Sequence, residues 1–233
     1  MTLFVKCETI SAMNIVLLCA GTSSRMGEVN KLLLPYGNTT IGESCAFEAL
    51  KYLFNTEEGG TLIVVTGFQR EKVEVSFKTN NEFYSTMSLS KTFVNLKFVY
   101  NSCYKEGQFS STKEGLKTLD DSPFFIALGD MPLVKASHYS TLEKFYEKAL
   151  SEGYAAIRPF YSIEGNKEPG HPVLHQGFLR KIIIDSPNTW SVKKVLSSYK
   201  VLELDFKDNS WALDLDTPQS YQDFKEHYYN GVV

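Results

Sequence analysis

The sequence is poor in several features that mark particular classes of protein. Its 233 residues include only four cysteines (Cys7, Cys19, Cys45 and Cys103), and no two of them form a C-x-x-C pair. A zinc site or a disulfide framework is therefore not expected, and this sparse usage is typical of a reducing, cytoplasmic location. No apolar run approaches the roughly 20 residues of a membrane-spanning helix, so we expect no membrane partner.

Positive charge is not in excess either. The chain has 24 Lys and Arg residues against 27 Asp and Glu residues, for a formal net charge of −3. Nucleic acids are bound through basic surfaces, so this balance argues against nucleic acid as the main partner. Any binding of phosphate must then rely on a local group of basic and hydrogen-bonding residues.

Core-forming residues, in contrast, are plentiful. Hydrophobic residues make up 43% of the chain and aromatic residues 13%, which is enough to fill a core and excludes global disorder. The length suits a single α/β domain. Residues 1–12 contain two charges, Lys6 and Glu8, and no long apolar core, so they make a poor signal peptide. We expect them to be a loose extension, with residues 13–233 forming one domain.

Apolar runs alternate with helical patterns along the chain. Strands are expected at residues 15–18, 62–65, 96–100, 124–128, 154–157 and 201–204, and helices at residues 41–53, 69–78, 111–119, 137–150 and from 218 onward. Residues 79–92 and 163–170 are expected to be irregular. The alternation predicts a doubly wound, mostly parallel α/β sheet with helices on both faces, whose ligands bind beyond the carboxyl ends of the strands.

Local signals mark several of these boundaries. Thr40 and Ser111 each precede a glutamate by three residues, which predicts a capping box at the start of a helix. Thr217 before Pro218 predicts the start of the last helix. The strand at residues 154–157 is expected to end before Pro159.

The most informative stretch is residues 17–27, LLCAGTSSRMG, followed by NKLLLP at residues 30–35. An apolar run stops at a glycine, and hydroxyl residues, Arg25, a second glycine and Lys31 come next. Glycine lets the backbone expose its N–H groups, the hydroxyls add donors and the basic side chains add fixed positive charge. This composition predicts a cradle for a polyphosphate. It is not a Walker A loop, because five residues separate Gly21 from Gly27, nor is it the dinucleotide fingerprint.

This stretch closely resembles the signature of the MobA-like nucleotidyltransferases, L-A-A-G-x-S-x-R-M-G followed by K-x-L-L-P. Cys19 stands in place of the first alanine. The resemblance implies a Rossmann-like nucleotide-diphospho-sugar transferase fold and an activity similar to that of the enzymes that attach CMP or GMP to molybdopterin. It also implies that Arg25 holds the β- and γ-phosphates and that Lys31 lies over the α-phosphate. The other nucleotide-binding residues implied in this loop are Ala20, Gly21 and Ser23.

Two further segments supply carboxylates for a metal ion. Asp130 follows the apolar strand 124–128 and lies in a tight turn, G-D-M-P-L, which suits a side chain that holds Mg²⁺ over a polyphosphate. In L-D-L-D-T-P, alternation puts Asp214 and Asp216 on one face of an extended segment. These segments resemble the family's G-D-x-P-L and D-I-D-T-P motifs. The resemblance implies a Mg²⁺ site formed by Asp130 and Asp216, with Asp214 as the second choice for the latter.

A fourth segment, GQFSSTKEG at residues 107–115, is similar to the family's base-binding motif, G-x-x-x-S-x-x-x-G. The resemblance implies that Gly107 and Ser111 contact the nucleotide base. Glycine allows the backbone to approach a flat base closely, and a serine can read the edge of the ring. The capping box explains Ser111 equally well, so both interpretations stay open.

A fifth segment resembles the family's acceptor motif, G-H-P-V. It implies that Gly170, His171 and Pro172 bind the acceptor, although His171 is also explained as a solvated loop histidine. A zinc pair formed by His171 and His175 is not expected, because Pro172 would break the helix that this spacing requires.

The implied reaction is nucleotidyl transfer. A terminal phosphate oxygen of the acceptor attacks the α-phosphorus of an NTP and pyrophosphate leaves, with Arg25, Lys31 and Asp130 as the catalytic residues. Such transfer depends mainly on positioning and on neutralising charge. Molybdopterin is the implied acceptor, Mg²⁺ the implied cofactor and a molybdoenzyme a further implied partner.

CTP is favoured over GTP as the nucleotide. Family members that use GTP have L-A-G-G in the first loop, whereas this chain has Ala20, whose methyl group narrows the space beside the base. Cys19 would crowd the base further if it points inward. Two alternatives stay open: another cytidylyl- or sugar-phosphate nucleotidyltransferase, and a non-catalytic nucleotide-binding accessory protein. The presence of Lys31 and Asp130 argues against the second.

Overall fold

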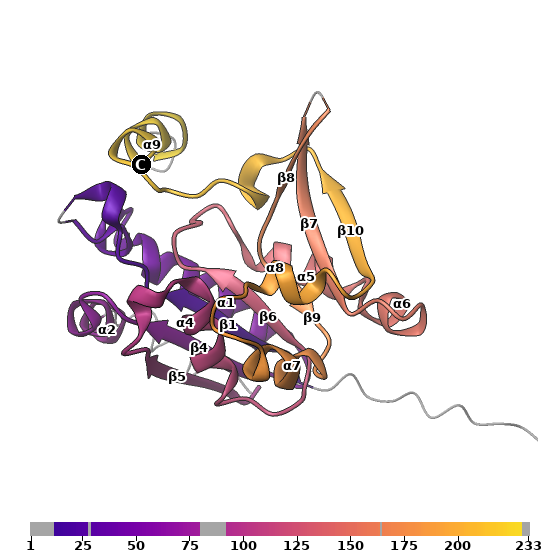
Figure 1. Ribbon diagram of the computed structural model, residues 1–233. Helices are drawn as coiled ribbons and strands as arrows, with labels where there is room; N and C mark the ends of the chain where they lie inside the picture. Colours follow the sequence, from indigo (N-terminus) through magenta and orange to yellow (C-terminus); the bar gives the residue numbers. More distant parts are fainter. Residues whose placement is uncertain (1–11, 28, 80–91, 164, 230–233) are drawn as a thin grey trace, which may run out of the picture.

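The computed structural model describes residues 12–27, 29–79, 92–163 and 165–229 (Figure 1). Residues 1–11 of the expected extension and residues 80–91 of the expected irregular segment lie outside these ranges. No helix within the described ranges is both long and apolar enough to cross a membrane.

One large sheet organises the described chain, with the strand order β10-β7-β9-β6-β1-β4-β5, and β8 pairs with β7. Its first half contains β1 (Asn14–Cys19), β4 (Gly60–Thr66), β5 (Val94–Tyr100) and β6 (Phe124–Leu128). Its second half contains β7 (Ala156–Ile163), β8 (Asn166–Pro169), β9 (Val173–His175) and β10 (Val201–Phe206). A separate short hairpin is formed by β2 (Pro35–Tyr36) and β3 (Thr39–Thr40).

Most pairings in the sheet are parallel. β1 pairs in parallel with both β4 and β6, β4 with β5, and β7 with β10. β9 is antiparallel to β6 and β7, and β8 is antiparallel to β7. The predicted doubly wound, mostly parallel α/β sheet is therefore confirmed.

Helices cover both faces of this sheet (Figure 1). One core contains residues of α1 (Ile41–Asn55), α2 (Arg70–Thr79), α5 (Ala136–Glu143) and α6 (Tyr146–Ser151). The other contains residues of α4 (Gln108–Leu116), α7 (Leu179–Asp185) and α8 (Val192–Leu196). The last helix, α9 (Pro218–Phe224), packs in a small third cluster and continues into a π-helical turn, Lys225–Tyr229.

β1 shows why the central strands read as continuous apolar runs. Every residue of Asn14–Cys19 is buried, because the strand has a helical layer on each side. Leu17 and Cys19 contribute to the core that contains α1 and α5, whereas Leu18 and Ala20 contribute to the core that contains α4 and α7. The side chains of Cys19 and Ala20 therefore lie on opposite faces of the sheet.

Two of the predicted helix starts are confirmed. Thr40 caps α1: its Oγ1 accepts from the Glu43 N–H at 3.4 Å, and its own N–H donates to Glu43 Oε2 at 2.6 Å. Thr217 caps α9, where its Oγ1 accepts from the Ser220 N–H at 3.0 Å and Pro218 occupies the first turn. The third prediction, a cap at Ser111, is wrong, because α4 already begins at Gln108.

Three other boundaries differ from the sequence-based predictions. The single helix expected at residues 137–150 is two helices, α5 and α6, because the Phe145 N–H bonds Leu142 O, three residues back, and ends the first one. β7 continues through Pro159. This residue lies between Ile157, the last residue paired with β9, and Phe160, the first paired with β8. The segment expected to be irregular at residues 163–170 contains β8.

Candidate active site

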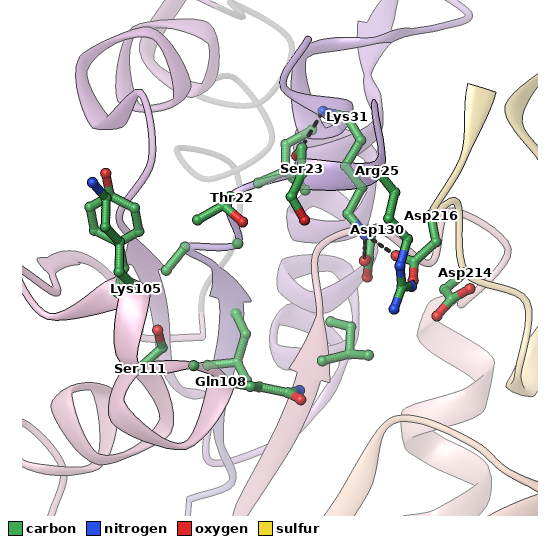
Figure 2. Close-up of a pocket in the computed structure, with 18 residues that line it drawn as sticks. Thr22, Ser23, Arg25, Lys31, Lys105, Gln108, Ser111, Asp130, Asp214 and Asp216 are labelled. Carbon is green, nitrogen blue, oxygen red and sulfur yellow. Dashed lines mark hydrogen bonds and ion pairs between the residues drawn. The ribbon is translucent and has the colours of Figure 1, made fainter. Parts of the chain in front are cut away.

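A pocket of about 400 Å³ opens at the carboxyl ends of β1 and β6 (Figure 2). The strand order reverses at this point, because the chain first adds β4 and β5 on one side of β1 and then returns to β6 on the other. Ligands of doubly wound sheets bind at such a switch point. The lining comes from the loop after β1, the turn into α4, the end of β6 and the segment before α9.

The loop after β1 is held in a tight conformation. Ser23 has a φ of 51° and Gly27 a φ of 72°, both in the left-handed region. A 3₁₀ turn, Ser24–Met26, lies between them, and the Met26 N–H donates to Ser23 O at 2.8 Å. The Ser23 Oγ accepts from the Lys31 N–H at 3.2 Å, which ties the loop to the next turn. The nucleotide-binding residues predicted here, Ala20, Gly21, Ser23, Arg25 and Lys31, all line the pocket.

Lys31 is positioned by the residue before it. Asn30 is 2% exposed, and its Oδ1 accepts from the Leu32 N–H at 3.1 Å to start the 3₁₀ turn Lys31–Leu33. Its Nδ2 donates to Phe68 O at 3.3 Å. Asn30 was not predicted to have a role, although an asparagine directly before a helical turn is a recognisable cap.

An ion-pair cluster closes one side of the pocket. Lys31 Nζ pairs with Asp130 Oδ2 and lies 2.5 Å from Asp216 Oδ1, while Arg25 Nη1 pairs with Asp216 Oδ2. Figure 2 shows these four side chains together, with Asp214 beside them. The cluster joins the first loop, the turn after β6 and the segment before α9. Asp130 and Asp216 therefore pair with basic side chains that could equally contact phosphate.

The charges in this cluster shift its titration. Burial alone would lower the pKa of Lys31, but the charges of Asp130 and Asp216 and its hydrogen bonds to them outweigh burial and raise it. Burial would raise the pKa of Asp216, but Lys31 and Arg25 outweigh it and hold that pKa below its usual value. The pKa of Asp214 is raised, first by burial and then by the negative charges of Asp216 and Asp130. Lys31 and Asp216 are thus stabilised in their charged forms.

The opposite side of the pocket is formed by the turn into α4. Gly107 has a φ of 107°, which an L side chain rarely adopts, and it leads directly into α4. Ser111 lies inside this helix, lines the pocket and is 3% exposed. Lys105 and Gln108 also line this side (Figure 2), and neither was predicted from the sequence.

A comparison with known protein families decides what kind of site this is. The family model described as the MobA-like NTP transferase domain matches residues 15–200. The chain belongs to this family. It is a nucleotidyltransferase, and the pocket at the switch point of its sheet is the candidate active site.

Individual relatives agree with this assignment. The chain is 26% identical over 219 residues to the molybdenum cofactor cytidylyltransferase of Escherichia coli K12, with 94% of this chain and 98% of that protein covered. An apo UDP-glucose pyrophosphorylase structure is similar with a TM-score of 0.71 and 14% identity, covering 97% of this chain and 100% of that one. A Mycobacterium tuberculosis protein solved with manganese has a TM-score of 0.65 and 19% identity, covering 93% and 100%. The two structures show a shared fold.

The segment expected to bind the acceptor lies outside the lining of the nucleotidyltransferase pocket. Gly170 packs against Trp211, whose carbonyl oxygen would lie 2.5 Å from an added Cβ. The His171 N–H donates to Trp211 O at 2.8 Å, and its Nδ1 lies 3.4 Å from Ile126 O. His171 is half-buried, so the ring is not a freely solvated loop histidine, and burial lowers its pKa. The structure thus places His171 beside Ile126 of β6, two residues before the strand reaches the pocket at Leu128, and Gly170 beside Pro159 of β7.

Cys19 does not crowd the base. It is absent from the pocket lining, and its Sγ would lie 2.5 Å from a Cβ added to Gly129. Its side chain therefore lies under the turn that carries Asp130, on the face of the sheet opposite Ala20. The expected crowding depends on a side chain that points inward, and this condition is not met, because alternation along the strand directs Cys19 into the other core.

Proposed function

We propose that this nucleotidyltransferase transfers CMP from CTP to the terminal phosphate of molybdopterin, with Mg²⁺ as cofactor and pyrophosphate as the second product. The observation that carries the proposal is the arrangement of the pocket. Arg25, Lys31, Asp130 and Asp216 form one charged side, and the turn into α4 forms the other. A triphosphate fits the charged side and a base the opposite one. The cytidylyltransferase relative supports the choice of nucleotide and acceptor.

The residues on the charged side would act mainly by positioning and by neutralising charge. The loop after β1 would bind the β- and γ-phosphates through its backbone N–H groups and Arg25. Lys31 would contact the α-phosphate, where negative charge increases as the acceptor oxygen attacks. A preorganised cation there stabilises the transition state more than the ground state. No covalent intermediate is required.

The carboxylates suit a hard divalent cation. No group of three His, Cys, Asp or Glu side chains within the described ranges is arranged to hold a metal unaided. Mg²⁺, however, takes one or two carboxylates and completes its coordination with water and substrate phosphate oxygens, and Asp130 and Asp216 offer two. In this cluster three carboxylates face two basic side chains, Lys31 and Arg25, so negative charge remains for a cation to balance. Bound Mg²⁺ would neutralise and orient the triphosphate.

The acceptor would approach from the side of Asp130 and Asp216. His171 lies near enough to Asp130 for that carboxylate to act on its pKa, which supports an acceptor segment next to the metal side of the pocket. Molybdopterin carries a terminal phosphate, so the metal side is also where the attacking oxygen is needed. A molybdoenzyme that receives the cytidylylated cofactor is the protein partner that the proposal implies.

Pyrophosphate release tests the proposal. The purified protein is assayed with each of the four NTPs and Mg²⁺, with molybdopterin, with a sugar phosphate and without acceptor. We expect release that needs both CTP and molybdopterin. Release with CTP and the sugar phosphate, but not with molybdopterin, would favour another cytidylyltransferase. If no combination of acceptor and nucleotide releases pyrophosphate, nucleotidyl transfer is contradicted.

A further inference from the structure

A buried hydrogen-bond network lies behind the base side of the pocket. Its centre is Asn101, the residue after β5, which is 1% exposed. The Asn101 N–H donates to Thr66 O at 2.9 Å, and its Oδ1 accepts from the Cys103 N–H at 2.9 Å. Its Nδ2 lies 2.9 Å from the hydroxyl oxygens of both Ser110 and Ser111. The sheet thus holds the amide group rigidly against the first two turns of α4.

The orientation of the Asn101 amide follows from its partners. A backbone N–H can only donate, so the side-chain atom that faces Cys103 must be the carbonyl oxygen. The NH₂ group therefore faces α4 and gives one hydrogen to each serine. Both serine oxygens act as acceptors toward Asn101.

The hydroxyl groups of Ser110 and Ser111 differ in whether they have a hydrogen-bond acceptor. The Ser110 hydroxyl donates to Gly107 O at 2.8 Å and lies 3.1 Å from Cys103 O. The Ser111 hydroxyl has no acceptor among the residues that the structure describes, and Ser111 lines the pocket (Figure 2). A buried O–H without an acceptor is unfavourable, so a ligand that supplies one is bound more tightly.

We infer that Asn101 is a positioning residue that fixes the Ser111 hydroxyl as a hydrogen-bond donor to an acceptor atom of the nucleotide base. This inference rests on the proposed function, because it names how the same pocket selects its base. Cytosine carries two adjacent acceptors, O2 and N3. Guanine carries N–H donors at N1 and N2 on the corresponding edge. A serine that must donate therefore favours CTP over GTP, independently of the space left by Ala20.

Three substitutions test the role of the network. Asn101→Asp keeps the shape and still accepts from the Cys103 N–H, but a carboxylate cannot donate, so the Ser111 O–H turns toward it. Ser111→Ala removes the donor. Ser110→Ala is the matched control, because this hydroxyl bonds the same amide but does not line the pocket. CTP affinity is measured by equilibrium titration, and KM and kcat by pyrophosphate release.

We expect Asn101→Asp and Ser111→Ala each to weaken CTP binding and raise its KM about tenfold, the size of one neutral hydrogen bond, with kcat changed far less. Ser110→Ala should keep the native KM. A general disruption of α4 would lower kcat and the unfolding temperature together. Native CTP binding in both Asn101→Asp and Ser111→Ala would overturn the inference.

Modified nucleotides locate the contact on the base. 3-Deazacytidine triphosphate lacks the N3 acceptor, and 2-thiocytidine triphosphate weakens the acceptor at position 2. The native protein should bind one of them about tenfold more weakly than CTP, whereas Ser111→Ala should bind that analogue and CTP alike. Equal binding of CTP and both analogues by the native protein would overturn the inference. Since this arm needs only Ser111→Ala, it remains decisive if Asn101→Asp does not fold.

These results separate the inference from the proposed function. Transfer from CTP without any dependence on Ser111 would remove the inference alone. Tight, Ser111-dependent binding of CTP without transfer to molybdopterin would uphold the inference and contradict the proposed acceptor.

Discussion

Lys31 Nζ lies 2.5 Å from Asp216 Oδ1, although 185 positions separate the two residues in the sequence. The same nitrogen pairs with Asp130, at the end of a central strand. The ammonium group of Lys31, which is proposed to contact the α-phosphate, therefore lies between Asp130 and Asp216, the two carboxylates proposed to hold Mg²⁺. Phosphate binding and metal binding are thus predicted to share one small volume, and substitutions there should affect both.

Lys31→Ala should abolish most transfer without unfolding the protein. The lysine contributes charge to the pocket rather than apolar surface to the core, and loss of one transition-state donor lowers turnover on the order of 10²–10³-fold. Pyrophosphate release and thermal unfolding are the measurements. Lys117→Ala, which removes an exposed lysine paired with Glu114, is the control and should be as active as the native protein. Near-native turnover in folded Lys31→Ala would exclude Lys31 from the site.

Asp216→Asn should be more damaging than Asp214→Asn, and Asp130→Asn should remove most Mg²⁺-dependent activity. Asp216 pairs with both Arg25 and Lys31, whereas Asp214 pairs with neither. The concentration of Mg²⁺ that gives half-maximal turnover should rise more for the Asp216 variant. The opposite order would make Asp214 the second metal ligand.

Much of the fold could be predicted because the central strands are simple. Asn14–Cys19 and Phe124–Leu128 have helices on both faces. Because both sides of these strands are buried, nearly all of their residues are apolar, and such runs are easily recognised in the sequence. The break between α5 and α6 could not be predicted, because the apolar period continues across it. Pro159 was misleading, because a proline normally ends pairing, and only the change of partner from β9 to β8 accommodates it.

Some parts of the candidate site could be predicted from the sequence and others could not. The loop after β1 and the turn with Asp130 follow strand ends, and the carboxyl ends of parallel strands gather at one edge of a sheet, so their proximity could be expected. Lys105 and Gln108 carry no pattern of their own and enter the pocket only because Gly107 turns the chain there. Ser111 has the spacing of a cap, but tertiary contacts start α4 three residues earlier.

Ala20→Gly should increase the use of GTP relative to CTP. Ala20 is 3% exposed and lines the pocket, so removing its methyl group makes room for a second ring. Exclusion by size is worth a few kcal/mol at most, so the change should be partial. Cys19→Ala is the matched control, because Cys19 faces the other core and should leave the ratio unchanged. Competition between equal concentrations of CTP and GTP measures the ratio of CMP to GMP transfer. Equal or greater GMP transfer by the native protein would contradict the assignment.

His175 should make the fold less stable in mild acid. Burial, together with the neighbouring Arg158 and His171, lowers the pKa of His175 to about 3. The unfolded chain takes up this proton near pH 6.5 and the folded one does not, so stability is complete above that pH and falls as the pH decreases toward 3. At pH 5 the loss is about 2 kcal/mol from this residue. The free energy of unfolding in urea is measured at pH 7 and pH 5. Its difference between the two pH values should be smaller for His175→Gln than for the native protein, and an equal difference would contradict the prediction.

Gly129→Ala should be harmful, and Cys19→Ala should repair it. Gly129 has no positive φ, so alanine is acceptable to the backbone, but the new Cβ would lie 2.5 Å from Cys19 Sγ and 3.1 Å from Leu18 O. Overpacking of this kind costs about 1–3 kcal/mol, and here it also displaces the turn that carries Asp130. In the double variant the sulfur is gone, so stability and turnover should recover together. The two changes lie in contact, and a double-mutant cycle of chemical unfolding should therefore give a favourable coupling energy. Simple additivity would mean that the added Cβ does not clash with Cys19 Sγ.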